Sequence, residues 1–338
     1  MRKIVKYIFI FLLIVIFAVF ILSLRKIPEK ITYGVSFSEL HAKELNLDWK
    51  EVYRAILDDL GVRHLRLSAH WTEIEPQEDN FIFSDFDYQI NEAEKRGAEV
   101  IVAIGRRLPG WPECHNPDWL NSLSNSQKEA ELMKYIENVV NRYKDNQSVK
   151  YWQVENEVFL TMYAKGHCAN FVDDESHGSL ESLLQKEIAL VKKLDPTRKI
   201  ILTDSGELGL WYKAYRNADV FGTSVYLYVW NHWVGQIRYP MTPGFFRIKS
   251  NLVNLLFGHK ETFLSELSTE PWLLQPIIDT PMDTQLESMS FEKFNKTIEF
   301  GKKTGFEKQL LWGAEWWYYL KKNNHPEFWE RAKEIFNN

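Results

Sequence analysis

Short apolar runs alternate along the chain with longer stretches in which apolar residues recur at helical spacing. Eight runs have the length and composition of buried strands: 31–35, 63–69, 99–104, 149–155, 199–203, 219–225, 261–266 and 308–314. Five stretches have one apolar face and one charged face, which predicts amphipathic helices: 49–60, 85–96, 127–143, 180–194 and 291–303. Gly61, Gly97 and Gly305 stand where such helices would end. The alternation predicts parallel βα units.

Eight βα units over about 300 residues predict a closed (β/α)8 barrel, with catalytic groups at the carboxyl ends of the strands. The alternative is an open, doubly wound sheet, which usually carries a glycine-rich phosphate loop after its first strand. Here the first strand reads Tyr33-Gly34-Val35-Ser36-Phe37, with only one glycine. We therefore expect residues 31–338 to form one barrel domain.

The first 30 residues have a different pattern. Residues 7–24 are apolar apart from Ser23, and Arg2, Lys3 and Lys6 precede them. The run is long enough to cross a bilayer, and no small-residue cleavage site follows it. It predicts an uncleaved transmembrane signal anchor with its basic head in the cytoplasm and the barrel outside. A buried core helix is the weaker alternative, because basic residues flank the run on both sides.

Composition narrows the choice of partners. The formal net charge is −5, from 41 basic and 46 acidic residues, which gives no electrostatic basis for binding nucleic acid. With 45% hydrophobic residues the chain can bury a core. The 13 Trp, 15 Tyr and 21 Phe suit both core packing and stacking against sugar rings. Nothing in the composition indicates an oligomeric state.

The chain has two cysteines, Cys114 and Cys168, in loop-like sequence after the third and fourth strands. Outside the cytoplasm they would form a disulfide, although two free thiols remain the alternative. No His-x-His or Glu-x-x-His pair accompanies His70, His115 or His167. The sequence therefore predicts no metal site and no cofactor.

Acidic residues end two of the predicted strands, at Glu157 after the fourth and Glu266 in the seventh. Carboxyl ends of barrel strands share one mouth, so these carboxyl groups should face a common cleft. Glycoside hydrolysis uses such a pair, one as proton donor and the other as nucleophile. Structural ion pairing is the alternative for both, and Glu155 and Glu270 are rivals for the two roles.

The chain resembles the clan of retaining (β/α)8 glycoside hydrolases that includes cellulases, mannanases and β-galactosidases. Asn156-Glu157 is similar to the clan's Asn-Glu signature, and Glu266 matches its nucleophile. The resemblance implies that Glu157 is the acid/base. Val158 departs from the proline that many members carry there, which leaves the subfamily and substrate open. Further residues are expected to bind sugar: Arg66, His70, Trp71, Asn156, Tyr226, Trp312 and Trp316.

The resemblance implies cleavage of β-linked oligosaccharides or polysaccharides by double displacement. The carboxyl groups of Glu157 and Glu266 should then lie about 5 to 5.5 Å apart. Arg66 and Tyr226 are expected to hydrogen-bond Glu266 and keep it ionised. The alternative from another class is a membrane-tethered carbohydrate-binding protein on a catalytically degenerate barrel. The presence of both glutamates favours the enzyme.

Overall fold

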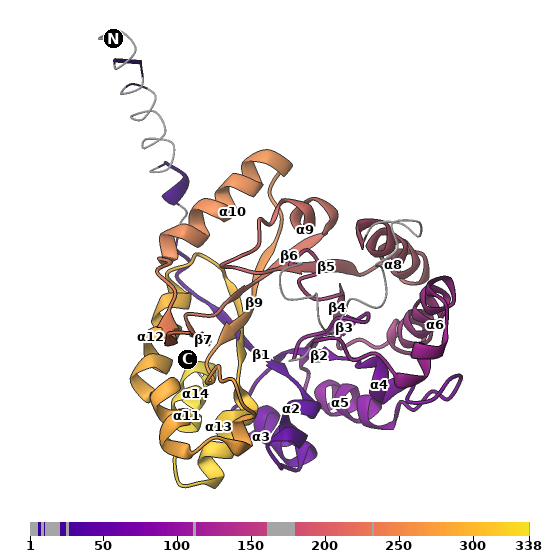
Figure 1. The fold of residues 1–338 in the computed structure, drawn as a ribbon, viewed down its shortest axis with the longest axis horizontal. Coiled ribbons are helices and arrows are strands. Elements are labelled where there is room, and N and C mark those ends of the chain that lie inside the picture. The colour runs from indigo at the N-terminus through magenta and orange to yellow at the C-terminus, as the bar shows by residue number, and fades with distance from the viewer. Residues whose placement is uncertain are drawn as a thin grey trace.

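The computed structural model describes residues 6–7, 10, 21–24, 27–110, 113–160, 180–231 and 233–337. Eight parallel strands form a closed barrel in the order β1-β10-β9-β6-β5-β4-β3-β2 (Figure 1). They are β1 (Thr32–Phe37), β2 (His64–Ser68), β3 (Glu99–Ile104), β4 (Val149–Val154), β5 (Lys199–Asp204), β6 (Val220–Val225), β9 (Thr262–Ser268) and β10 (Lys308–Trp312). All eight predicted strands are confirmed to within a few residues. Pairing of β1 with β10 closes the barrel and excludes the open sheet.

Helices surround the barrel, as the (β/α)8 prediction requires. They are α2 (Glu39–Glu44), α3 (Trp49–Asp58), α4 (Trp71–Ile74), α5 (Ser84–Lys95), α6 (Asn125–Tyr143), α8 (Leu180–Leu194), α9 (Tyr212–Asn217), α10 (Pro243–Phe257), α11 (Met282–Ser288), α12 (Phe291–Lys302), α13 (Ala314–Lys322) and α14 (Glu327–Asn337). The five predicted helices are α3, α5, α6, α8 and α12. The sequence patterns missed α10, α13, α14 and the hairpin of β7 (Tyr228–Asn231) and β8 (Gly235–Arg238).

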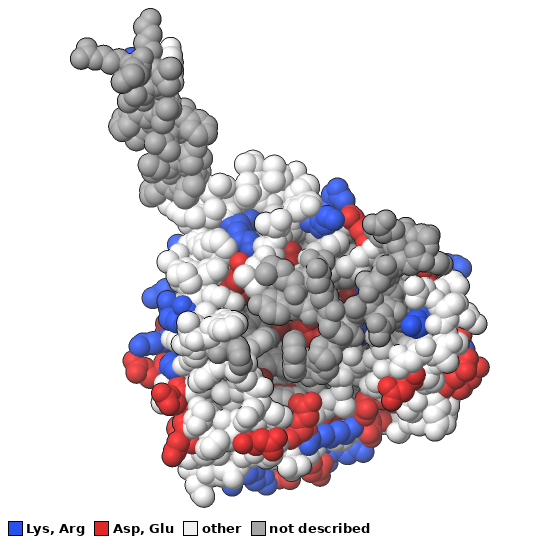
Figure 2. Space-filling view, in the orientation of Figure 1, with Lys and Arg blue, Asp and Glu red and all other residues white. Residues whose placement is uncertain are grey.

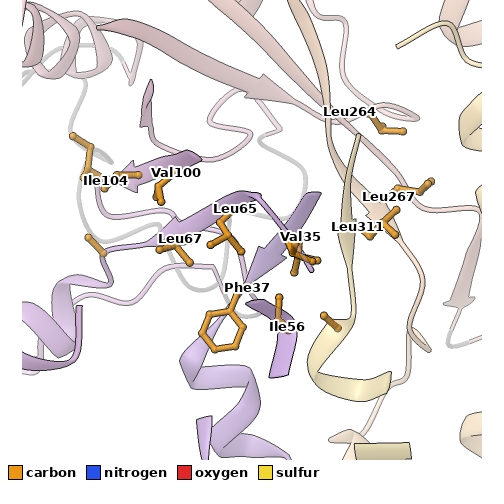
Figure 3. Packing of buried hydrophobic residues seen from close by; sticks show 14 of the residues in the cluster. Val35, Phe37, Ile56, Leu65, Leu67, Val100, Ile104, Leu264, Leu267 and Leu311 are labelled. Atoms are coloured by element: carbon orange, nitrogen blue, oxygen red, sulfur yellow. The ribbon is translucent and has the colours of Figure 1, made fainter. Parts of the chain in front are cut away.

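Side chains alternate between the two faces of each strand. Outward-facing residues such as Val35, Leu65, Val100 and Leu311 belong to the main core between strands and helices (Figure 3). Inward-facing apolar residues form a second, smaller cluster, which comprises Ile101, Ile201, Val220, Phe263 and Leu310. Nearer the carboxyl ends the inward positions become polar, with Ser36, Arg66 and Gln153 all buried. The site therefore lies at the carboxyl ends of the strands, where the inward-facing residues change from apolar to polar.

Two predictions fall largely on residues that the structure does not describe. Most of residues 7–24 lie outside the described ranges, and so does Cys168. Among the described residues, no helix has both the length and the apolar content needed to cross a bilayer. The anchor and the disulfide therefore stay predictions.

Candidate active site

Arg66 lies inside the barrel on β2 and is 1% exposed, so its charge requires partners. Its Nη1 donates to Glu266 Oε1 at 2.6 Å, and its Nη2 donates to Asn156 Oδ1 at 2.7 Å. Its Nε donates to Gln153 Oε1 at 2.8 Å. One guanidinium thus joins β2 to β9 and to the end of β4, which fixes the two halves of the mouth relative to each other.

Both carboxylate oxygens of Glu266 accept strong hydrogen bonds. Oε1 receives the Arg66 bond, and Oε2 accepts from the Tyr226 hydroxyl at 2.7 Å. Burial, reinforced by the negative charge of Glu266, raises the pKa of Tyr226 well above its usual range, so this hydroxyl keeps its proton. Donors on both oxygens favour the ionised form of Glu266.

Glu157 has the opposite environment. Its Oε1 accepts one hydrogen bond, from Ser224 Oγ at 2.7 Å. Burial raises the pKa of Glu157 well above its usual range, and the charges of Glu266 and Glu113 raise it further. The two carboxyl groups therefore have unlike surroundings, as the acid and the nucleophile of a glycosidase require.

The backbone at the end of β4 is strained. Glu155 and Glu157 have φ values of 59° and 43°, a left-handed region that non-glycine residues rarely adopt. Such a conformation costs roughly 1 to 3 kcal/mol per residue and persists only where the surroundings hold it. Here the Glu157 N–H donates to Thr203 Oγ1 at 2.9 Å, and Arg107 Nη1 donates to the Glu157 carbonyl at 2.9 Å. The turn therefore presents Glu157 in one orientation.

Asn156 is oriented by its acceptor. Its Oδ1 receives hydrogen bonds from Arg66 and from Thr203 Oγ1, the latter at 3.0 Å. With the oxygen occupied, Nδ2 points toward Glu113 Oε1 at 3.4 Å. One N–H of Nδ2 thus donates to Glu113, and the other can donate to a substrate hydroxyl.

The rivals named from sequence have other contacts. Glu155 is 1% exposed, and its carboxylate accepts from the backbone N–H groups of Arg106 at 3.0 Å and Arg107 at 2.8 Å. These bonds tie β4 to the loop after β3. Glu155 is a support for the turn rather than an acid in the mouth.

Glu270 lies beside Trp312, the last residue of β10. Its Oε1 accepts from Trp312 Nε1 at 2.6 Å, and its Oε2 lies 2.8 Å from His41 Nε2. Burial opposes a charge on His41, but Glu270 and Glu44 raise the pKa of its imidazole well above the usual range. Glu270 therefore fixes the Trp312 ring.

The structure brings together Arg66, Asn156, Glu157, Tyr226 and Glu266 from four strands, β2, β4, β6 and β9. Trp312 lies at the end of β10 and is 8% exposed. His70 packs against His115, with 4.6 Å between ring centroids, and within the described residues no hydrogen bond joins it to Glu157 or Glu266.

Two predicted sugar contacts are wrong. Trp71 is fully buried, donates to Glu75 Oε2 at 2.8 Å and stacks on Tyr135. Trp316 is also fully buried and donates to Gln285 Oε1 at 2.9 Å. Each lies near the start of a helix, and its side chain points into the layer of helices instead of into the barrel mouth. Both residues stabilise the core.

Sequence patterns also missed Glu113, in the loop after β3. Its carboxylate forms an ion pair with Arg107 at 2.5 Å and accepts a hydrogen bond from Asn156 Nδ2. Burial raises the pKa of Glu113, Arg107 opposes the shift, and Glu266 adds to it. The sequence carries one local signal for such a residue, the Arg106-Arg107 pair after an apolar strand. Buried arginines there require carboxylate partners.

Within the described part of the chain, no group of three or more His, Cys, Asp or Glu side chains could hold a metal ion.

The chain is a parallel (β/α)8 barrel with two buried glutamates, Glu157 and Glu266, at the carboxyl ends of its strands. A model of glycosyl hydrolase family 10 matches residues 50–208, which include Arg66, Asn156 and Glu157. A search of curated proteins found no match.

Solved structures share the fold at low sequence identity. Native xylanase 10B from Thermotoga maritima is 16% identical with a TM-score of 0.55, over 86% of this chain and 85% of that one. A family 5 mannosidase from Rhizomucor miehei is 14% identical with a TM-score of 0.54, over 84% and 81%. A β-galactosidase from Halorubrum lacusprofundi is 14% identical with a TM-score of 0.54, over 83% of this chain. The chain spans only 52% of that β-galactosidase.

Proposed function

We propose that the protein is a retaining glycosidase that cleaves β-linked oligosaccharides or polysaccharides, with Glu157 as acid/base and Glu266 as nucleophile. The observation that carries the proposal is the contrast between the two carboxyl groups. Glu266 accepts from Arg66 and Tyr226, whereas Glu157 has a single hydroxyl donor and a raised pKa.

In the first step, Glu266 attacks the anomeric carbon while Glu157 gives its proton to the departing glycosidic oxygen. The bond between the anomeric carbon and that oxygen breaks, and a covalent glycosyl ester forms on Glu266. Esterification removes the negative charge of Glu266, which is one cause of the raised pKa of Glu157. That pKa then falls, so Glu157 can accept a proton from the water that hydrolyses the ester.

Three further groups are positioned to bind the reacting sugar. Asn156 has its amide N–H groups free of the Arg66 network, and Tyr226 borders the nucleophile. Trp312 is held by Glu270 at the end of β10, where its ring can stack on an apolar sugar face. These contacts favour a neutral sugar substrate over a charged one, because Arg66 and Glu266 already neutralise each other.

Labelling with a mechanism-based epoxide or 2-fluorosugar, followed by mass mapping, tests the assignment. We expect one adduct on Glu266, and none in Glu266→Gln. An adduct on Glu270 would overturn the choice of nucleophile. The panel of probes that react also reports which sugar the site accepts.

The second candidate function is that of a tethered carbohydrate-binding protein. Such a protein would bind sugar through Trp312 and Asn156 without hydrolysing it. Hydrolysis of aryl β-glycosides and polysaccharides, with and without chelator, distinguishes the two. We expect turnover that a chelator does not change. Sugar binding without turnover of any substrate would favour the binding protein.

We also propose that residues 7–24 anchor the protein in the membrane with the barrel outside the cytoplasm. The support is the apolar run after Arg2, Lys3 and Lys6, with no cleavage site following it. Protease added to intact cells should digest the barrel while a cytoplasmic control stays intact. Protection of both proteins alike would contradict this orientation.

A further inference from the structure

Helix α10 has two apolar faces, whereas an amphipathic helix on a barrel needs only one. The inner face packs on the barrel through Phe246, Ser250 and Val253, which are all buried. The outer face is a stripe at helical spacing formed by Ile248, Leu252, Leu255 and Leu256. Leu252, Leu255 and Leu256 are 42%, 75% and 60% exposed. We call these four residues the α10 stripe.

A neighbouring loop adds to this apolar surface. Lys249, on one side of the stripe, donates from Nζ to the carbonyl oxygens of Gly206 at 2.6 Å and Gly209 at 2.8 Å. These bonds hold the loop between β5 and α9 against α10. Within that loop Leu208 and Leu210 are 38% and 78% exposed. Clustered exposed leucines mark a contact surface, whereas scattered ones do not.

The other side of the stripe contacts the end of the predicted anchor. Asn251 Nδ2 donates to the Leu22 carbonyl at 2.6 Å, and Arg247 Nε donates to the Ser23 carbonyl at 3.0 Å. Residues 21–24 therefore lie against α10 (Figure 1). The chain leaves the barrel beside its most exposed leucines.

Charge around α10 fits the same surface. No Asp or Glu occurs between residues 220 and 260, although the chain has 46 acidic residues. Arg238, Arg247, Lys249 and Lys260 lie within that segment. Figure 2 shows the surface over α10 as white, with basic side chains bordering it. An apolar stripe with basic residues at its border suits a bilayer interface with anionic headgroups.

We infer that the α10 stripe rests in the lipid interface of the membrane that the N-terminal segment enters, and so holds the barrel in one orientation on that membrane. The inference rests on the proposed anchor but not on the glycosidase activity. In a helix of this kind the apolar face enters the boundary between headgroups and acyl chains. Two contacts, the anchor and the stripe, would prevent the barrel from turning freely on its linker.

The test uses the full chain in vesicles of phosphatidylcholine and phosphatidylglycerol. An environment-sensitive fluorophore is placed on Leu255→Cys or, as a matched control on an exposed helix position, on Asn91→Cys in α5. We expect emission from position 255 to shift to shorter wavelength and to lose most of its intensity when lipids carry a spin-label quencher near the headgroup. Emission from position 91 should change in neither respect.

Three outcomes would overturn the inference. Equal emission and quenching at positions 255 and 91, in protein that resists extraction by alkaline carbonate, would show that the stripe stays in water. A blue shift at position 255 without quenching by lipid would assign the stripe to a second copy of the chain. Extraction of the whole protein by carbonate would remove the anchor proposal and this inference together, while leaving the proposed hydrolysis untouched.

Discussion

Glu155 and Glu157 lie two residues apart at the end of β4, both buried and both with positive φ. Two backbone N–H groups and the Arg106 guanidinium, 3.7 Å away, surround the Glu155 carboxylate. Glu157 has one hydroxyl donor and two negative neighbours, Glu266 and Glu113. The difference shows that burial alone does not make a catalytic acid. Burial raises the pKa of both carboxyl groups, but Arg106 and two backbone N–H groups oppose the rise at Glu155, whereas Glu266 and Glu113 add to it at Glu157.

The largest expected effect is the loss of the nucleophile. Glu266→Ala should lower kcat on the order of 10⁴-fold or more, because no other group can form the covalent intermediate. Azide should restore part of the activity and give a glycosyl azide of inverted configuration. A variant that keeps wild-type turnover would remove Glu266 from the mechanism.

Glu157→Ala should have an effect that depends on the leaving group. Aryl glycosides with good leaving groups need little acid assistance, whereas poor leaving groups should react about 10² to 10⁴-fold more slowly. The wild-type enzyme should lose activity at alkaline pH, because the proton on Glu157 is lost as the pH rises through its raised pKa. In the variant this alkaline limb should disappear, as measured by pH profiles of kcat.

Glu155→Gln should act on stability instead. One carboxylate oxygen becomes an amide N–H that faces a backbone N–H of Arg106 or Arg107, which leaves a buried donor unpaired at a cost of about 1 to 3 kcal/mol. Glu157→Gln is the matched control, since an amide resembles a protonated carboxyl group. Chemical denaturation should show a loss for position 155 and little change for position 157; equal losses would erase the distinction between the two.

An effect that appears only as the pH changes is expected at Glu315, a buried carboxyl group whose Oε1 accepts the Ser38 N–H at 2.6 Å. Burial raises its pKa from 4.5 to about 7, and His41 opposes the shift. A raised folded-state pKa contributes stability that is present below pH 4.5 and is lost as the pH rises through about 7. Relative to Glu315→Gln, the wild-type free energy of unfolding should fall by about 3 kcal/mol or less between pH 4.5 and 8. A constant difference would mean that folding does not raise the pKa of Glu315.

The barrel could be predicted from sequence because its strands are short apolar runs with clear boundaries, such as 99–104 and 199–203. Helix α10 was not predicted because leucines on its outer face hide the helical alternation of apolar and polar residues. The same leucines form the α10 stripe.

Within the site, strand position predicted that Glu157 and Glu266 share one mouth, because barrel strands have a fixed direction. Asn156 and Tyr226 were predicted from the resemblance to the glycoside hydrolase clan. Trp71 and Trp316 were misassigned because a sequence does not tell which way the first turn of a helix points its side chains. Glu113 was missed because its loop has no periodicity. Its role depends on Arg107 and Asn156, and only the fold brings these residues together.

The central claim is double displacement by Glu266 and Glu157, and the configuration of the first-formed sugar tests it most directly. Proton NMR should follow the anomeric signal during early hydrolysis of a β-glycoside by the wild-type enzyme, before mutarotation. The account predicts that the β-anomer appears first, because two inversions restore the original configuration. An α-anomer as the first product would contradict it, since that result requires direct attack by water.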